Sequence, residues 1–485
     1  MMWAWRSVRA LHTSLRRTKG TKALLPTGWE AVIGIECHAQ LLAPTKLFSH
    51  LPAGYQITQK RKPFAHSGTV SIRFEDGYLS TPNDAVDVPI LQLQLEQDTG
   101  KSMYAATDAD SHVSLIDYNR AGVALVEIVS APVLRTPEQA GAYVRKLRQL
   151  LRHVGASDGN MNEGSLRCDV NVSIHRINEP FGTRCEIKNL NSVKFMMHAI
   201  DYEIRRQFRE LSQGRIIEPS TLGFNEATGE TYVQRQKEEM LDYRFMPEPN
   251  VAPLEISPER IEALNSSLPE MPDARHARLR EQYGLSIRDV NVLTRLNAED
   301  DASEIAVLGP EHAGRTSHPN AVDYFEALVH FGCEPQVAAN WTIHLLPKYL
   351  GQAQLTFSLN PVGPAALAEL LHILEEQVIT QSTAQSLLRE FVLNQSIPQR
   401  DGYLCIREVI KERGLLRMQD TELLPLCKEI VQACPEEVEA IRRGKNKVIM
   451  RLVGETLRRA KGRADPEHVQ RLLTELTSVE TASTQ

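Results

Sequence analysis

A single carboxylate interrupts an apolar stretch in the first third of the chain. Within Leu115–Pro132 (LIDYNRAGVALVEIVSAP), a polar turn closed by Gly122 leads into residues 123–129, which are apolar except for Glu127. The β-branched residues predict a buried strand. Because an unpaired buried charge costs several kcal/mol, Glu127 should face a cation, either an arginine or a metal ion. From this stretch alone, an edge strand whose glutamate faces water or an arginine remains open.

Two further segments carry side chains that can bind a metal ion. Residues 32–41 (VIGIECHAQL) alternate in polarity, so Glu36 and His38 should project from the same face of a strand. A carboxylate beside an imidazole can bind a divalent ion, or the two groups can bind each other, which is the more common arrangement. Residues 90–95 alternate in the same way and lead directly to Glu96.

Polar side chains fill one face of each of two later predicted strands, residues 162–174 and 183–192. The first strand carries Arg167, Asp169 and Asn171 on one face, and the second carries Glu186 and Lys188 on one face, followed by Asn189. A solvated sheet face usually carries Lys, Glu and Thr, whereas this mixture suits hydrogen bonding to a ligand. We therefore predict a sheet that lines a cleft, with a solvated face as the alternative.

The intervening segments supply the elements that would position these residues. A hydroxyl N-cap followed by proline at Thr136-Pro137 predicts a helix that runs to Val154, and residues 195–211 predict another. Prolines around Pro253 mark a domain boundary. Beyond it, apolar residues recur at helical spacing over residues 258–264, 274–283, 320–331, 335–346, 364–375, 383–392 and 401–412. Strands followed by helices predict the α+β class.

A basic helix is predicted near the C-terminus, at residues 446–461. Its apolar side chains share one face, and Lys447, Arg451 and Arg458 lie on another. The surrounding residues 442–463 contain nine Lys/Arg and one acid. Such a surface would bind a phosphate backbone, with a merely solvated helix face as the alternative.

Composition limits the class of protein. A length of 485 residues predicts two or three domains at roughly 150 residues each. A mean hydropathy of -0.30 and the absence of a long apolar run argue against a membrane span. The net charge of -6 argues against a wholly basic nucleic-acid binder. Seven cysteines without a C-x-x-C pair indicate reduced thiols inside the cell and no zinc-ribbon site.

The first 29 residues differ from the rest. Six Lys/Arg alternate with apolar residues there, and no acid precedes Glu30. This composition is typical of a mitochondrial presequence that is removed on import into the matrix, with a disordered basic arm as the alternative. In either case we exclude this segment from the fold.

Eight motifs in order resemble the B subunits of glutamyl-tRNA(Gln) amidotransferases, the GatB family, over about residues 31–474. The motifs are GIECHAQL, LPAGYQITQ, LEQDTGKS, LIDYNRAGVALVEIVSAP, NEGSLRCDVNVSI, TRCEIKNLNS, TGETYVQRQKEEMLDYRFMPEP and GKNKVIMRLVGETLRRAKG. The resemblance implies a ligase that works in a heterotrimer with an A and a C subunit. The B subunit would phosphorylate the γ-carboxylate of glutamate on tRNA(Gln) with ATP. Ammonia released from glutamine by the A subunit, a glutaminase, would then displace the phosphate.

The resemblance also implies site residues. The positions that match the family's metal site are Glu36, His38, Glu96 and Glu127. Oxygen ligands suit Mg²⁺, and the single histidine leaves room for Mn²⁺. Five further residues match motifs of the family's cradle domain, and only from their position and chemistry do we expect them to bind ATP or the aminoacyl end of Glu-tRNA(Gln): Arg167, Asp169, Asn171, Lys188 and Asn189. Binding of tRNA would fall to Lys445, Lys447, Arg451, Arg458, Arg459 and Lys461.

The implied architecture is a mixed-sheet cradle domain, a helical linker domain and a helical tail of the YqeY type. With the presequence at residues 1–29, we place these domains at residues 30–253, 254–412 and 413–485.

One departure from the family pattern lies near residue 50. Family members carry several dozen residues between a T-K-L-F-S run and an L-P-x-G-Y-Q run, whereas here Phe48-Ser49-His50 continues directly into Leu51-Pro52. A cradle without that segment would lose part of its pocket wall. A second class of function, a non-catalytic tRNA-binding or assembly subunit, therefore stays open beside the catalytic one.

Overall fold

The computed structural model divides into two compact units, residues 1–275 and 276–485, which are described separately. The residues it describes are 25–43, 64–98, 101–106, 112–118, 121–236, 256–296, 320–400 and 403–479. None of the helices in these segments has the length and apolarity needed to cross a membrane.

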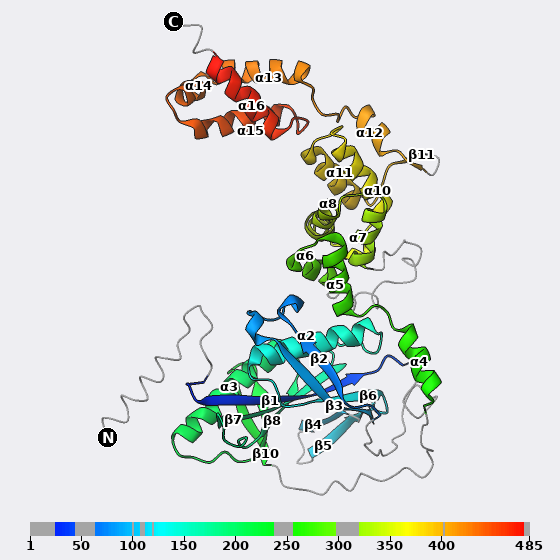
Figure 1. Ribbon diagram of the computed structural model, residues 1–485, viewed down its shortest axis with the longest axis vertical. Helices are drawn as coiled ribbons and strands as arrows, with labels where there is room; N and C mark the ends of the chain where they lie inside the picture. Colours follow the sequence, from blue (N-terminus) through cyan, green and yellow to red (C-terminus); the bar gives the residue numbers. More distant parts are fainter. Residues whose placement is uncertain are drawn as a thin grey trace, which may run out of the picture. The chain divides into compact units, whose positions relative to one another are not determined.

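The first unit is built on an open sheet of eight strands (Figure 1). The strands are β1 (Trp29–Gln40), β2 (Gly68–Ile72), β3 (Val86–Gln97), β6 (Ala124–Ser130), β7 (Leu166–Arg176), β8 (Cys185–Leu190), β9 (Ser220–Asn225) and β10 (Glu230–Gln236). Their order is β10-β9-β8-β7-β1-β6-β3-β2, and all neighbours are antiparallel except β8 and β9. The sheet is thus mixed, as predicted. An additional hairpin, β4 (Lys101–Ala106) with β5 (His112–Asp117), was not predicted.

Alternation along β1 divides the sheet into two faces. Ala31, Ile33, Ile35, Cys37 and Ala39 are all buried in one hydrophobic core. The same core contains side chains from α2 (Pro137–His153) and α3 (Val193–Ser212), so these helices cover the apolar face. Figure 1 shows α2 lying across the sheet. The intervening residues of β1 face the other side, where the polar residues gather.

Helix α2 begins where the sequence predicts. Thr136 is its N-cap and accepts a hydrogen bond from the backbone N–H of Gln139, and proline follows at the first helical position. Lys146 of α2 is buried between two carboxylates, those of Asp76 (2.6 Å) and Asp273. Burial lowers the pKa of the Lys146 amine, but these two hydrogen-bonded carboxylates raise it more, so the net shift is upward.

The helices after residue 256 fall in both units. Helix α4 (Pro258–Ser267) and the first turn of α5 (Pro272–Tyr283) belong to the first unit. The rest of α5 and the later helices form two hydrophobic clusters in the second unit. One cluster includes side chains of α5, α6 (Ile287–Arg295), α7 (Ala321–His330), α8 (Pro335–Asn340), α9 (Leu346–Gln352), α10 (Pro364–Glu375), α11 (Gln381–Asn394) and α12 (Ile406–Glu412). The other joins α13 (Asp420–Ala433), α14 (Pro435–Arg442), α15 (Ile449–Arg459) and α16 (Pro466–Val479).

Two predicted helices differ in detail from the structure. The helix expected at 335–346 is interrupted by a π-helical turn, Trp341–Leu345, because Pro347 cannot donate a backbone hydrogen bond to the preceding turn. The helix expected from residue 401 begins only at Ile406, after a short hairpin of β11 (Gln399–Arg400) and β12 (Tyr403–Leu404).

The predicted domain limits stay predictions, and the limit after residue 29 meets the structure in part. Pro253 and most of the presequence lie outside the described residues. Trp29, the last residue assigned to the presequence, is the first residue of β1, and its ring packs edge-on against Phe208 of α3 at 5.4 Å. A processed chain that keeps this contact must therefore be cleaved before Trp29.

Candidate metal and ligand site

The polar face of the sheet brings four side chains into one row across four adjacent strands. Strand register places Gln94 of β3 opposite Glu127 of β6, and Glu127 opposite His38 of β1. On the other side of β1, His38 lies opposite Arg167 of β7. Directly opposite residues on one face have Cβ atoms about 4.5–5.5 Å apart, so these groups are within reach of one another.

Three of the four predicted metal ligands converge. The ligand atoms of His38, Glu96 and Glu127 all lie within 4.8 Å of one another. The Nε2 atom of His38 is 3.5 Å from Oε2 of Glu96 and 3.7 Å from Oε1 of Glu127. Both carboxylates are buried, and the imidazole is half-buried. Two carboxylates and one imidazole form a donor set that fits Mg²⁺ or Mn²⁺, and a bound cation would offset the repulsion between the acids.

Glu36 shares the face of β1 with His38 but does not join this group. Its Oε1 accepts a hydrogen bond from Nδ2 of Asn171 on β7 at 2.9 Å. The predicted ligand-binding role of Asn171 stays a prediction, and the structure shows that its side chain also holds Glu36. The sequence could place Glu36 on the correct face but could not tell which residues of that face meet.

Arg167 binds a carboxylate other than Glu127. Its guanidinium donates to Oδ2 of Asp98 at 2.8 Å, and the amide of Gln40 donates to the same oxygen at 3.3 Å. The sequence left open whether Glu127 faces an arginine such as Arg167 or a metal ion. The hydrogen bond to Asp98 holds the Arg167 side chain, and strand register places Arg167 opposite His38.

Lys188 of β8 lies between two carboxylates on the same polar face. Its ammonium is 2.9 Å from Oδ2 of Asp169 and 2.9 Å from Oε1 of Glu186. Burial lowers the pKa of the Lys188 amine, but the two carboxylates raise it more, so the net shift is upward. Asn189 lies in β8, but its side chain is outside the described residues.

Gln94, like Asp98 and Gln40, is a site residue that was not predicted from the sequence. It is 4% exposed, and its amide donates a hydrogen bond to Oε2 of Glu127. The available signal was the alternation in QLQLEQ, which places Gln94 on the same face as Glu96.

The basic residues predicted to contact tRNA are exposed in and beside α15. Their arginines bind carboxylates: Arg451 that of Glu437 (3.1 Å), Arg458 that of Glu455 (2.6 Å) and Arg459 that of Glu429 (2.6 Å). Glu429 and Glu437 belong to α13 and α14, so the surface is less positive than the local sequence indicates. Lys445, Lys447 and Lys461 form no ion pair with any residue that the structure describes.

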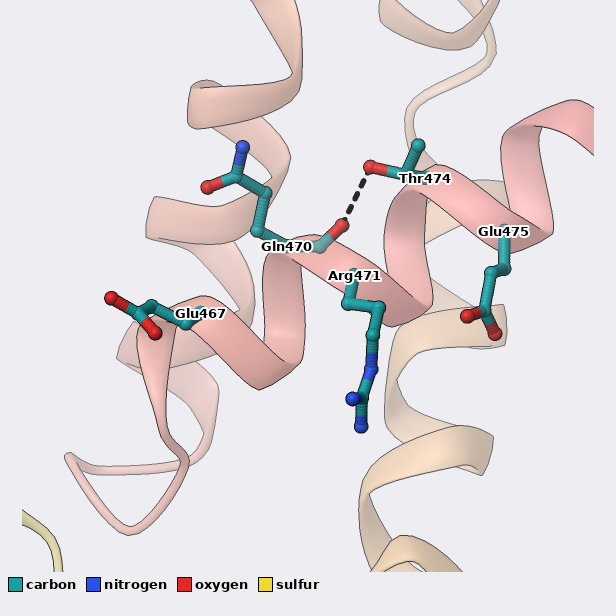
Figure 2. Close-up of a pocket in the computed structure, with 5 residues that line it drawn as sticks. All are labelled: Glu467, Gln470, Arg471, Thr474 and Glu475. Atoms are coloured by element: carbon teal, nitrogen blue, oxygen red, sulfur yellow. Dashed lines mark hydrogen bonds between the residues drawn. The ribbon is translucent and has the colours of Figure 1, made fainter.

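A shallow hollow on α16 does not look like a second site. It is lined by Glu467, Gln470, Arg471, Thr474 and Glu475. Figure 2 shows these side chains spread along the helix instead of converging, with the Thr474 hydroxyl donating to the Gln470 carbonyl at 2.7 Å.

Comparison with known proteins assigns the family. A family model described as the GatB/GatE catalytic domain matches residues 50–262, and one described as the GatB domain matches residues 323–476. The B subunit of the mitochondrial glutamyl-tRNA(Gln) amidotransferase of Mycosarcoma maydis is 40% identical, over 93% of this chain and 86% of the relative. The chain belongs to the GatB family. The same mitochondrial protein of Laccaria bicolor is 40% identical over 88% of this chain and 77% of the relative.

A bacterial member of the GatB family is also similar along most of its length. The B subunit of the aspartyl/glutamyl-tRNA(Asn/Gln) amidotransferase of Rickettsia felis is 36% identical, over 88% of this chain and 80% of the relative.

The alignments are consistent with a segment missing from this GatB chain. The alignment with the Mycosarcoma maydis relative runs over 561 positions, more than the 485 residues of this chain, so the relative contains segments that this chain lacks. The match to the catalytic-domain model starts at residue 50, where the sequence departs from the family pattern. Strand β1, with Glu36 and His38, precedes that match, and the junction itself lies outside the described residues.

The Lys188 cluster yields a test of the polar face. Replacing Lys188 by Met should lower the free energy of unfolding by about 1–3 kcal/mol at pH 7, because Asp169 and the buried Glu186 lose their shared cation. Since the pKa of Lys188 is raised on folding, its contribution is fully present below the ordinary lysine pKa of about 10.4 and is lost as pH rises through the folded value. Urea denaturation from pH 7 to 11 should show the deficit constant up to about pH 9 and shrinking above about pH 10.4.

The matched control is Lys194→Met, on an exposed position of α3. It should change the free energy of unfolding by no more than about 0.5 kcal/mol. An equal effect of the two variants would show that the Lys188 cluster adds nothing specific.

Proposed function

We propose that this chain is the component of a glutamyl-tRNA(Gln) amidotransferase that phosphorylates Glu-tRNA(Gln) with ATP and transfers ammonia to the activated glutamate. The proposal rests on family membership and on one observation: His38, Glu96 and Glu127 converge on the polar face of the sheet. A carboxylate is a poor electrophile, so the γ-carboxyl group needs a phosphate leaving group before ammonia can displace it. The names of the relatives state the same substrate for those proteins.

The three converging residues would hold Mg²⁺, or alternatively Mn²⁺. Bound there, the ion would neutralise charge on the transferred phosphoryl group. Burial of Glu96 and Glu127 excludes water, which strengthens their interaction with a cation. Glu36, two residues before His38, would position Asn171 instead of binding the ion directly.

The neighbouring polar residues would bind the nucleotide or the aminoacyl end of the tRNA. Arg167 lies beside His38 in the row and is oriented by Asp98. Its guanidinium would contact a phosphate or carboxylate near the bound ion. Asp169, Asn171 and Lys188 extend this surface along β7 and β8. Asn189 is proposed to contribute from its place in the β8 sequence alone. The glutaminase of the heterotrimer, its A subunit, would supply ammonia from glutamine, and the C subunit would complete the assembly.

The tail at residues 413–485 would be the YqeY-like module that binds tRNA. Lys447, Arg451 and Arg458 follow one another at helical spacing, which places them on one side of α15 and of the turn that precedes it. Their side chains are exposed, so Lys447 can bind a phosphate directly and the two arginines can exchange their protein carboxylates for phosphates.

A non-catalytic tRNA-binding or assembly subunit is the second candidate. The observation that favours it is the set of segments present in the Mycosarcoma maydis relative and absent here. It predicts a chain that joins the complex and binds tRNA without phosphorylating it.

The decisive test is Glu127→Gln in the assembled complex. The change keeps the shape of the side chain and removes one charged ligand, so phosphorylation of Glu-tRNA(Gln) and transamidation should fall by on the order of 10²-fold or more. Assembly by size-exclusion chromatography and tRNA binding should be retained. Glu163→Gln, in an exposed loop, is the matched control and should leave activity unchanged.

The outcomes of this test separate the candidates. A wild-type complex that binds tRNA but lacks phosphorylation would favour the non-catalytic role. Normal phosphorylation by Glu127→Gln would contradict the metal site.

The tail is tested by the triple variant Lys447→Ala, Arg451→Ala, Arg458→Ala. Each lost phosphate contact should weaken tRNA binding and reduce the slope of log affinity against log salt by about one unit. Glutaminase activity of the complex should not change. The triple variant Arg280→Ala, Arg389→Ala, Arg407→Ala removes the same charge from exposed arginines outside the tail. An equal loss there would mean that only net charge matters.

Localisation to the mitochondrial matrix is proposed from the basic first segment and from the mitochondrial relatives. We predict that the protein isolated from mitochondria begins after the basic residues and before Trp29, because Trp29 belongs to β1. N-terminal sequencing that finds Met1 or Met2 would exclude a cleaved presequence.

A further inference from the structure

The hydrogen bond between Gln94 and Glu127 assigns different roles to the two oxygens of that carboxylate. Oε2 accepts from the Gln94 amide, whereas Oε1 faces His38 at 3.7 Å. Both residues are buried, at 4% exposure each, and they stand directly opposite each other on β3 and β6. The backbone of the sheet therefore fixes the contact, and water does not compete for it.

We propose that Gln94 determines which divalent cation the site accepts, because its hydrogen bond to Oε2 of Glu127 would make coordination through both oxygens of that carboxylate less favourable. The inference rests on the metal site proposed above. It assigns to the chain a preference for small cations such as Mg²⁺ and Mn²⁺ over Ca²⁺.

The reason is the different coordination of these ions. Ca²⁺ takes six to eight oxygen ligands and often uses carboxylates in bidentate fashion, whereas Mg²⁺ takes six ligands at about 2.1 Å and usually only one oxygen from each carboxylate. A site built from two carboxylates and one imidazole gains most for Ca²⁺ if each carboxylate supplies both oxygens. The hydrogen bond from Gln94 occupies one lone pair of Oε2 and so disfavours that option for Glu127, whereas coordination of Mg²⁺ through Oε1 alone would be unaffected.

The type of residue at position 94 also matters. An amide donates a hydrogen bond without carrying a charge, so Gln94 fixes Glu127 without itself neutralising the charge of the carboxylate. A lysine or arginine would cancel that charge, and an apolar residue would release Oε2. Groups that orient metal ligands in this way typically change metal affinity by about 10–100-fold when they are removed.

The test uses the full-length chain and Mn²⁺, whose free concentration is measured by electron paramagnetic resonance. Bound Mn²⁺ is displaced with Mg²⁺ and, separately, with Ca²⁺. In the wild-type protein Mg²⁺ should be the better competitor. In Gln94→Leu the ratio of the Ca²⁺ to the Mg²⁺ concentration needed for half displacement should fall by about tenfold, because Glu127 can then chelate with both oxygens.

Two further variants keep the result interpretable. Gln94→Met keeps the length of the side chain and should give the same change in selectivity with less disturbance of packing. Gln97→Leu, on the same strand but on the opposite face, is the matched control and should keep the wild-type ratio.

The possible results test the metal site and the selectivity role of Gln94 separately. If the wild-type chain binds no Mn²⁺, the proposed metal site itself is wrong. If it binds Mn²⁺ but neither Gln94 variant changes the ratio of Ca²⁺ to Mg²⁺, the selectivity role is overturned and the metal site stands.

Discussion

Neighbouring side chains on a β-strand must point to opposite faces of the sheet. In the first unit this alternation matters most at β1, which lies between β7 and β6 within the sheet. Its odd-numbered residues from Ala31 to Ala39 are buried under α2 and α3, and the intervening residues carry the polar site. A slip of one residue would exchange the two sets. Exposing Ile33 and Ile35 alone would cost about 3–6 kcal/mol, which is more than a single polar contact on the other face contributes. The apolar side therefore fixes the register on which the polar side depends.

The polar face is stable because its buried charges are shared among partners. Lys188 contacts two carboxylates, Asp98 accepts from both Arg167 and Gln40, and Glu127 accepts from Gln94. Removing one member of such a network leaves a buried group unsatisfied. Binding residues can therefore be held in place before a ligand arrives.

Much of this arrangement could be predicted from local sequence, because alternation and capping are local. The strand at β1, the face shared by Glu36 and His38, and the start of α2 at Thr136 are of this kind. Which residues meet across the sheet depends on register between strands that are distant in sequence. That is why Glu36 was grouped with His38, although it binds Asn171.

The contacts of Gln94 and of two tail arginines could not be predicted for the same reason. Gln94 resembles an ordinary polar strand residue until β6 places Glu127 beside it. Arg451 and Arg459 each bind an acid of another helix, which the local sequence does not show.

The ion pairs of Lys146 should limit local unfolding at the start of α5. The buried ammonium of Lys146 binds Asp76, before α2 in the sequence, and Asp273, in the first turn of α5. The first turn of α5 cannot leave α2 without depriving a buried ammonium of one of its carboxylates, so this end of the helix should not fray independently. In hydrogen exchange, amides of this turn should follow the slow opening of α2, unlike those of the exposed α4.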